Sequence, residues 1–295
     1  MILFSTLKSS VFYYPTDYST GFLIVGDFFR KYAYAVWYTV VISWKTDGFR
    51  KCKYSLFRTN FFRKDFSSMK AYERLLSYVK IFTPSNEEST SSPSSRCQFD
   101  LARLLVEELK GLGISDVTLD DHCYVYAHLP ATEGLEHCKA LGFIAHMDTV
   151  SDFCDHAVTP VITENYDGKD LPLGTSGRTL SPEMFSHLTS LAGRTLITSD
   201  GTTILGADDK AGIAEILTAL EHILTEKIPH GPLCVAFTPD EEIGMGPAHF
   251  NVKKFGADYA YTLDGDTEGE IQYENFNACS ASFEVNGFII HPCEA

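Results

Sequence analysis

Charged and imidazole side chains follow three apolar runs of this sequence, at the point where each run ends. Carboxylates held close together repel one another, so they need shared protons or a bound cation. Histidine and carboxylate ligands without cysteine suit zinc, manganese or cobalt in a hydrolytic site. The residues concerned are His146 and Asp148 after the first run, Asp240, Glu241 and Glu242 after the second, Asp264 and Asp266 after the third, and the pair Asp208 and Asp209 before a helical pattern.

The adjacent pair Glu241 and Glu242 suits a division of labour within such a site. One carboxylate binds a metal while its neighbour stays free as a general base, and a site with two metals needs a carboxylate that bridges them. Each motif alone has an ordinary explanation, because a lone histidine after a strand is commonly a hydrogen-bonded core residue and Asp208–Asp209 fits a helix N-cap. The four motifs together, in this order, favour a metal site.

Alternating strand and helix patterns predict the elements that position these groups. Amphipathic helices are predicted over 69–82 and 99–113, and Gly111 and Gly113 end the second. Residues 117–130 predict two strands joined by a turn, and the three apolar runs before the site residues predict buried strands. Strands that alternate with helices predict an α/β fold, a mixed and mostly parallel sheet flanked by helices, with the site at the carboxyl ends of its strands.

The charge of the chain changes abruptly near residue 68. Residues 1–68 hold 10 Lys and Arg against 4 Asp and Glu, and 19 of the 38 aromatic residues, whereas the whole chain has a net charge of −15. The acidic remainder lacks the clustered basic residues that phosphate binding requires, so no nucleic-acid partner is expected. Eight cysteines without a C-x-x-C pair argue against a structural zinc knuckle and favour a reducing compartment.

The composition of the segment 1–68 indicates a history different from that of the rest of the chain. We predict that it is a basic, aromatic-rich extension outside the fold, because Met69 begins a fresh amphipathic pattern. Its longest apolar stretch, 32–44, is shorter than the roughly 20 residues of a membrane-spanning helix. That stretch fits a buried strand pair or an interfacial segment, and a membrane-surface role for residues 1–68 is an alternative.

Six stretches from about Met69 onward have a recognisable family pattern. They are GFIAHMDT, TLITSDGTTILGADDKAGIAEI, IPHG, VAFTPDEEIG, AYTLDGD and ENFNA. On these stretches the sequence resembles the peptidase T family, the tripeptide aminopeptidases of a zinc-exopeptidase superfamily, over about three quarters of the chain. The resemblance implies a cytoplasmic, metal-dependent hydrolase with two zinc ions per subunit that removes the N-terminal residue of tripeptides.

The resemblance also implies a role for each site residue. Glu241 would be the general base that accepts a proton from the attacking water and passes it to the leaving amine, and Asp148 would orient a metal ligand. Asp208 would bridge the metals, with a cis peptide bond to Asp209. The metal ligands implied are His146, Asp208, Glu242 and Asp264, and His291 would bind the substrate.

The sequence departs from the family pattern at its C-terminal end. The resemblance implies a catalytic domain over 69–277 and the beginning of a lid and dimerisation domain over 278–295, so the chain is expected to be truncated there. The family's last histidine ligand then has no counterpart, and the homodimer formed through the lid is not expected. Missing strands would also leave an open sheet edge at Leu233–Phe237 and its neighbours.

Two further interpretations stay open. A related amidohydrolase or dipeptidase of the same superfamily would share the six metal and catalytic residues and differ in substrate. A non-enzyme, an inactive fragment with an incomplete metal site, would bind one metal loosely. The number of metals bound and a panel of peptide substrates distinguish these alternatives.

Overall fold

The computed structural model describes residues 69–265 and 269–273, Glu284, and the backbone of five strands within residues 1–68. Residues 1–264 form one compact unit and residues 265–295 another. The predictions at Asp266 and His291 lie outside the described residues, as does most of 278–295. None of the helices described is long and apolar enough to cross a membrane.

A five-stranded mixed sheet carries the residues of interest, in the order β14-β8-β13-β7-β6. Strand β8 is parallel to both β13 and β14, whereas β7 is antiparallel to β13 and to β6. The predicted mixed α/β sheet is therefore confirmed. The strands are β6 (Asp116–Leu119), β7 (Val125–Leu129), β8 (Leu141–His146), β13 (Leu233–Thr238) and β14 (Tyr259–Thr262).

The predicted open edge at Leu233–Phe237 is wrong. Strand β13 lies in the middle of the sheet, with β8 on one side and β7 on the other. The edge strands of the described sheet are β14 and β6 instead, and the four residues of β14 are all exposed. Tyr259 is 60% and Tyr261 44% exposed, so the edge carries apolar surface.

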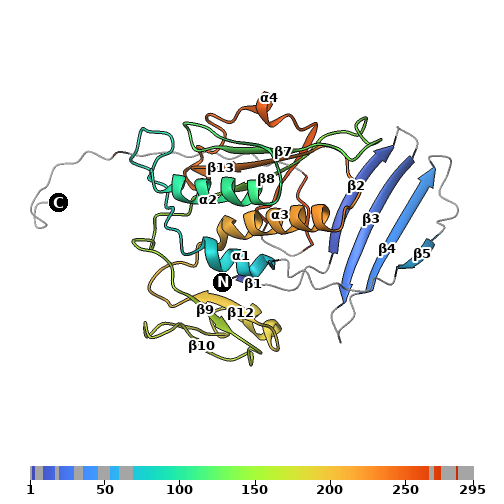
Figure 1. Cartoon of the computed structure of the whole chain (residues 1–295). Coiled ribbons are helices and arrows are strands. Elements are labelled where there is room, and N and C mark those ends of the chain that lie inside the picture. Colours follow the sequence, from blue (N-terminus) through green and yellow to red (C-terminus); the bar gives the residue numbers. More distant parts are fainter. Residues whose placement is uncertain are drawn as a thin grey trace, which may run out of the picture. The chain divides into compact units, whose positions relative to one another are not determined.

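Helices cover both faces of this sheet (Figure 1). Alternation along β7 and the residue before it places Val125 and Ala127 in the larger core with α1, α2 and α3. Tyr124 and Tyr126 lie in a smaller core with Phe255 of α4. The predicted helices and the helix stop at Gly111 are confirmed. The helices are α1 (Ala71–Tyr78), α2 (Gln98–Gly111), α3 (Ala207–Thr225) and α4 (Val252–Phe255), with the short 3₁₀ turns η1 (Ser186–Leu191) and η2 (Glu241–Ile243).

A polar salt-bridged cluster joins the three helices of the larger core. The guanidinium of Arg74 on α1, 2% exposed, lies 2.6 Å from a carboxylate oxygen of Glu108 on α2 and 2.8 Å from one of Glu221 on α3. The hydroxyl of Tyr78 donates to the other oxygen of Glu108 at 2.5 Å. The cluster fixes α1 against α2 and α3 while pairing every charge it buries.

Segments between β8 and α3 contribute strands to two small antiparallel sheets. Strand β9 (Pro160–Thr163) pairs with β12 (Leu196–Ser199), and β10 (Leu171–Pro172) with β11 (Thr179–Leu180). Residues 1–68 contribute β1 (Ile2–Leu3), which pairs with β12, and a four-stranded antiparallel sheet. That sheet consists of β2 (Ser9–Thr16), β3 (Thr20–Phe29), β4 (Val36–Lys45) and β5 (Tyr54–Thr59). That residues 1–68 are an extension outside the catalytic fold stays a prediction.

Candidate metal centre

Parallel pairing brings the carboxyl ends of β8, β13 and β14 to one edge of the sheet. His146, the last residue of β8, lies beside Thr238 of β13, and the amide of Met147 donates to the Thr238 carbonyl at 2.8 Å. Ile144 of β8 lies beside Thr262, and its carbonyl accepts from the Leu263 amide at 2.8 Å. The residues that come after each strand therefore start from neighbouring positions, as the sequence predicts.

Helix α3 reaches the same edge because one of its residues has no side chain. A Cβ atom on Gly212 would lie 2.1 Å from the Leu263 carbonyl oxygen, so only glycine allows the helix to pack this closely against the end of β14. Asp208 and Asp209, in the first turn of α3, depart from helical φ and ψ and are joined by a cis peptide bond. The cis bond agrees with the resemblance to the peptidase T family.

One imidazole and two carboxylates meet at this edge. The Nε2 atom of His146 lies 3.0 Å from a carboxylate oxygen of Asp208 and 3.8 Å from one of Asp264. Each of these three residues offers one possible ligand atom, and the three atoms all lie within 4.8 Å of one another. The His146 side chain is 1% exposed, whereas the Asp208 side chain is 67% exposed, so the group opens to solvent on one side.

Asp148 is bonded to both neighbouring strand ends. The Nδ1 atom of His146 lies 2.9 Å from the Asp148 carbonyl oxygen and 3.4 Å from a carboxylate oxygen of the same residue. The backbone amides of Glu241 and Glu242 donate to the two carboxylate oxygens of Asp148, at 2.9 and 3.1 Å. Asp148 thus fixes the ring of His146, leaving Nε2 toward the acidic group, and also holds the loop after β13.

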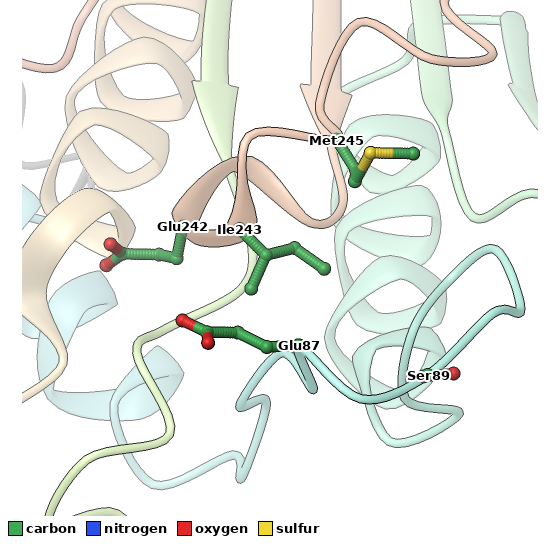
Figure 2. Close-up of a pocket in the computed structure, with 5 residues that line it drawn as sticks. All are labelled: Glu87, Ser89, Glu242, Ile243 and Met245. Atoms are coloured by element: carbon green, nitrogen blue, oxygen red, sulfur yellow. The ribbon is translucent and has the colours of Figure 1, made fainter. Parts of the chain in front are cut away.

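The two glutamates lie differently from the other predicted ligands. A carboxylate oxygen of Glu241 is 3.8 Å from His146 Nε2, and its side chain is 50% exposed. Glu242 lies outside the group of three and lines a pocket of about 480 Å³. Figure 2 shows the carboxylates of Glu87 and Glu242 reaching toward the same end of this pocket, with Ile243 beside them and Met245 and Ser89 toward the other end.

The titration of the site reflects an excess of negative charge. Burial raises the pKa of Glu242 to about 7, and the Asp208 charge adds to the effect. Burial likewise raises the pKa of Asp264 to about 6, against the opposing effect of His146. Burial alone would lower the pKa of His146, but its contacts with Asp148 and Asp208 outweigh that and raise it to about 11. These are the conditions under which a divalent cation replaces protons.

Sequence reasoning gave Asp209 no separate role and missed Glu87 and Gln98, although all three shape this region. Asp209, 4% exposed, accepts from the amides of His146 and Gly212 rather than facing solvent. Glu87 lines the pocket from a serine-rich loop and has no motif that singles it out. Gln98, fully buried, bonds to Asp240 from 142 residues away along the chain. Only the three-dimensional arrangement reveals contacts of this kind.

Comparison with known proteins identifies the family. The pattern of peptidase family M20/M25/M40 matches residues 200–279. A peptidase T of Clostridium perfringens is 52% identical over 227 residues, 77% of this chain and 55% of that relative. A peptidase T of Halothermothrix orenii is 53% identical over 76% of this chain and 55% of its own length.

Among solved structures, an aminopeptidase of Bacillus cereus aligns with a TM-score of 0.48 at 25% identity, over 67% of this chain and 43% of that one. The chain spans about half the length of the curated relatives it matches. The predicted resemblance is confirmed by the sequence relatives. The chain therefore belongs to peptidase family M20/M25/M40, and over about three quarters of its length it is similar to proteins described as peptidase T.

Proposed function

We propose that this protein is a metal-dependent aminopeptidase that releases the N-terminal residue of short peptides, tripeptides above all. The observation that carries the proposal is the buried imidazole of His146, which faces Asp208, Asp264 and Glu241 within 3.8 Å at the joined strand ends. The donor set of one nitrogen and several oxygens, without cysteine, fits zinc.

His146, Asp208, Glu242 and Asp264 would hold the two zinc ions. When bound, the metals would polarise the scissile carbonyl and make water more acidic. The carboxylate of Glu241, half exposed and 3.8 Å from His146 Nε2, is placed to accept a proton from the attacking water. It would then deliver that proton to the leaving amine, so the residue works as base and acid in turn.

The pocket beside Glu242 supplies room for the peptide. Its walls combine the carboxylates of Glu87 and Glu242 with the apolar side chains of Ile243 and Met245. A carboxylate suits the free ammonium of a peptide, and apolar walls suit its first side chain. We further propose that His291, outside the described residues, contacts the substrate, that the whole protein acts in the cytoplasm, and that dimerisation belongs to the lid domain of the full-length family members.

Glu241→Gln is the variant that tests this proposal. The purified chain is incubated with zinc and a tripeptide at neutral pH, with and without a chelator. We expect hydrolysis that the chelator abolishes, and a fall in kcat of about 10²- to 10⁴-fold in Glu241→Gln with zinc binding retained. Hydrolysis that persists in the chelator would contradict a metal mechanism. Loose binding of a single zinc ion without any hydrolysis would instead favour the inactive-fragment alternative for this polypeptide.

A further inference from the structure

A buried polar cluster lies directly behind the loop that carries Glu241 and Glu242. Its members are Ser94, Gln98 and Asp240, which we call the Asp240 joint, and they are 6%, 0% and 2% exposed. The Asp240 carboxylate accepts from the Ser94 amide at 2.8 Å, from the Ser94 hydroxyl at 2.5 Å and from Gln98 Nε2 at 2.7 Å. All three donors are neutral, so hydrogen bonds rather than an opposite charge hold this carboxylate.

The joint holds Asp240 in an uncommon backbone conformation. Asp240 has φ +57° and ψ +28°, the left-handed region that residues other than glycine adopt rarely. Gln98 bonds to this residue twice, because its Oε1 atom also accepts from the Asp240 amide at 3.3 Å. The carbonyl of Asp240 accepts from the Met245 amide at 2.9 Å. A conformation of this kind persists only where surrounding contacts over-determine it.

The two residues after Asp240 are the proposed general base, Glu241, and a proposed metal ligand, Glu242. Their amides are bonded to Asp148, beside His146. The loop is therefore held from two sides: Asp148 fixes its two amides from the metal side, and the Asp240 joint fixes its first residue from the core side. Neither contact involves the Glu241 or Glu242 carboxylates, which remain available for chemistry.

The joint also reaches the opposite wall of the pocket. Ser94 lies at the end of the serine-rich loop that carries Glu87 and Ser89, and its hydroxyl accepts from the Asn86 amide at 2.9 Å. Asp240 begins the loop that supplies Glu242 and the rest of the lining. One buried carboxylate thus ties together the two loops between which the pocket opens (Figure 2).

We propose that Gln98 and Asp240 are positioning residues, which set the Glu241–Glu242 backbone against His146 and fix the spacing of the two pocket walls. This inference rests on the proposed function only in assigning metal and base roles to the two glutamates. The positioning itself is a property of the metal-free chain. Loss of a residue that hydrogen-bonds a metal ligand changes metal affinity by about 10- to 100-fold, and we expect loss of the joint, which sets the backbone of such residues, to act within that range.

Three variants test the joint by reversing its hydrogen bonds. Gln98→Glu sets a second carboxylate against that of Asp240, and Asp240→Asn replaces an acceptor with a donor that faces the Gln98 amide. In the double variant Q98E/D240N the roles are exchanged, because the new amide at position 240 donates to the new carboxylate at position 98, and the Ser94 hydroxyl can accept. The double variant should therefore recover much of what each single variant loses.

Arg74→Gln is the matched control. This substitution also disrupts a buried polar cluster, but one that lies away from the metal centre. Thr218, to which Arg74 donates a hydrogen bond, is ten residues along α3 from Asp208, or about 15 Å. Both kinds of variant lower the temperature of unfolding. A purely structural role for the joint predicts that they are equivalent in every other measurement.

The first measurement is hydrogen exchange in the metal-free chain, read at the peptide that contains the Glu241 and Glu242 amides. We expect exchange about tenfold faster in each single variant, near normal in the double variant, and unchanged in Arg74→Gln. The second measurement is zinc affinity together with the visible spectrum of bound Co²⁺. We expect affinity about 10- to 100-fold weaker with an altered spectrum in the single variants only.

Equal exchange at this peptide in Gln98→Glu and Arg74→Gln, or a double variant no better than the single ones, would overturn the positioning role. The exchange measurement needs no metal, so it decides the inference even if the parent chain binds no zinc. Failure of the parent chain to bind zinc would contradict the proposed function alone.

Discussion

Two clusters among the described residues set carboxylates around one buried cation, and they balance the charge differently. Around Arg74, one guanidinium faces two carboxylates at 2.6 and 2.8 Å, and burial of the cation is outweighed by those partners, so its pKa is raised. Around His146, one imidazole faces Asp208, Asp264 and Glu241. The first cluster, which we call complete, sets two carboxylates against one guanidinium. The second, which we call incomplete, sets three against one imidazole and so holds the larger excess of negative charge.

The cluster around Arg74 has a structural role, whereas the one around His146 has the charge of a functional site. Both clusters combine a buried cation with carboxylates on different elements, so burial and ion pairing alone do not tell them apart. The raised pKa values of Glu242 and Asp264 distinguish the two clusters, because they show that ionisation of these carboxyl groups is unfavourable unless a cation binds. An excess of carboxylates at converging strand ends is thus a stronger sign of function than a buried ion pair.

The largest effect is expected at the complete cluster. Arg74→Met leaves Glu108 and Glu221 without their cation, and each of those side chains is only about 20% exposed. We expect the free energy of unfolding to fall by about 3 kcal/mol, because removing one partner strands a partly buried charge. Denaturant unfolding measures the loss. Zinc affinity should stay unchanged, and a parallel loss of zinc binding would erase the distinction between the clusters.

The next effect concerns the incomplete cluster. His146→Gln removes the only nitrogen ligand among the described residues of the metal group, so we expect zinc to bind about 100-fold more weakly, or about 2.7 kcal/mol. Calorimetric titration with zinc measures this.

His230→Gln is the control for that titration. His230 is also buried, at 8% exposed, but its Nδ1 atom lies 2.7 Å from the Gly231 carbonyl oxygen. Equal losses of zinc affinity in the two variants would mean that general destabilisation, not ligation, explains the first result.

The sequence predicts the incomplete cluster better than it predicts the sheet around it. His146, Asp208 and Asp264 each follow or precede a recognisable apolar pattern, and strands of an α/β sheet share a carboxyl edge, so their meeting can be expected from local signals. The position of β13 within the sheet cannot be predicted from local signals, because strand order depends on pairing between distant segments. The expectation of an open edge at Leu233–Phe237 failed for that reason.

The Asp240 joint was beyond sequence reasoning for a related cause. Gln98 begins an amphipathic helix and reads as an ordinary polar residue of its first turn. Its burial and its bonds to Asp240 arise only when a loop 142 residues away folds over it. Local patterns find residues that carry charge at strand ends, but they do not find neutral residues that position those charges.

The smallest expected effect concerns how the free energy of unfolding changes with pH. Bound metal should reverse the sign of that change. The fold raises the pKa of Glu242 from its ordinary 4.5 to about 7 and that of Asp264 from 3.8 to about 6, so between about pH 4 and 7 the folded chain binds more protons than the unfolded one. The stability of the metal-free chain must therefore fall as the pH rises through this window. The raised pKa of His146 acts in the same direction above pH 6.5, since the unfolded imidazole loses its proton first.

Because these carboxyl groups are partly exposed, solvent screening limits the expected loss to about 1 kcal/mol between about pH 5 and 7.5. Zinc requires the ionised carboxylates and the neutral imidazole, so zinc-saturated protein should instead gain stability over the same range. Unfolding by urea at the two pH values, in chelator and in zinc, measures both slopes. A metal-free slope that is flat or rising would mean that the acidic group is already balanced by its own residues, like the cluster around Arg74, and that the two regions do not differ in kind.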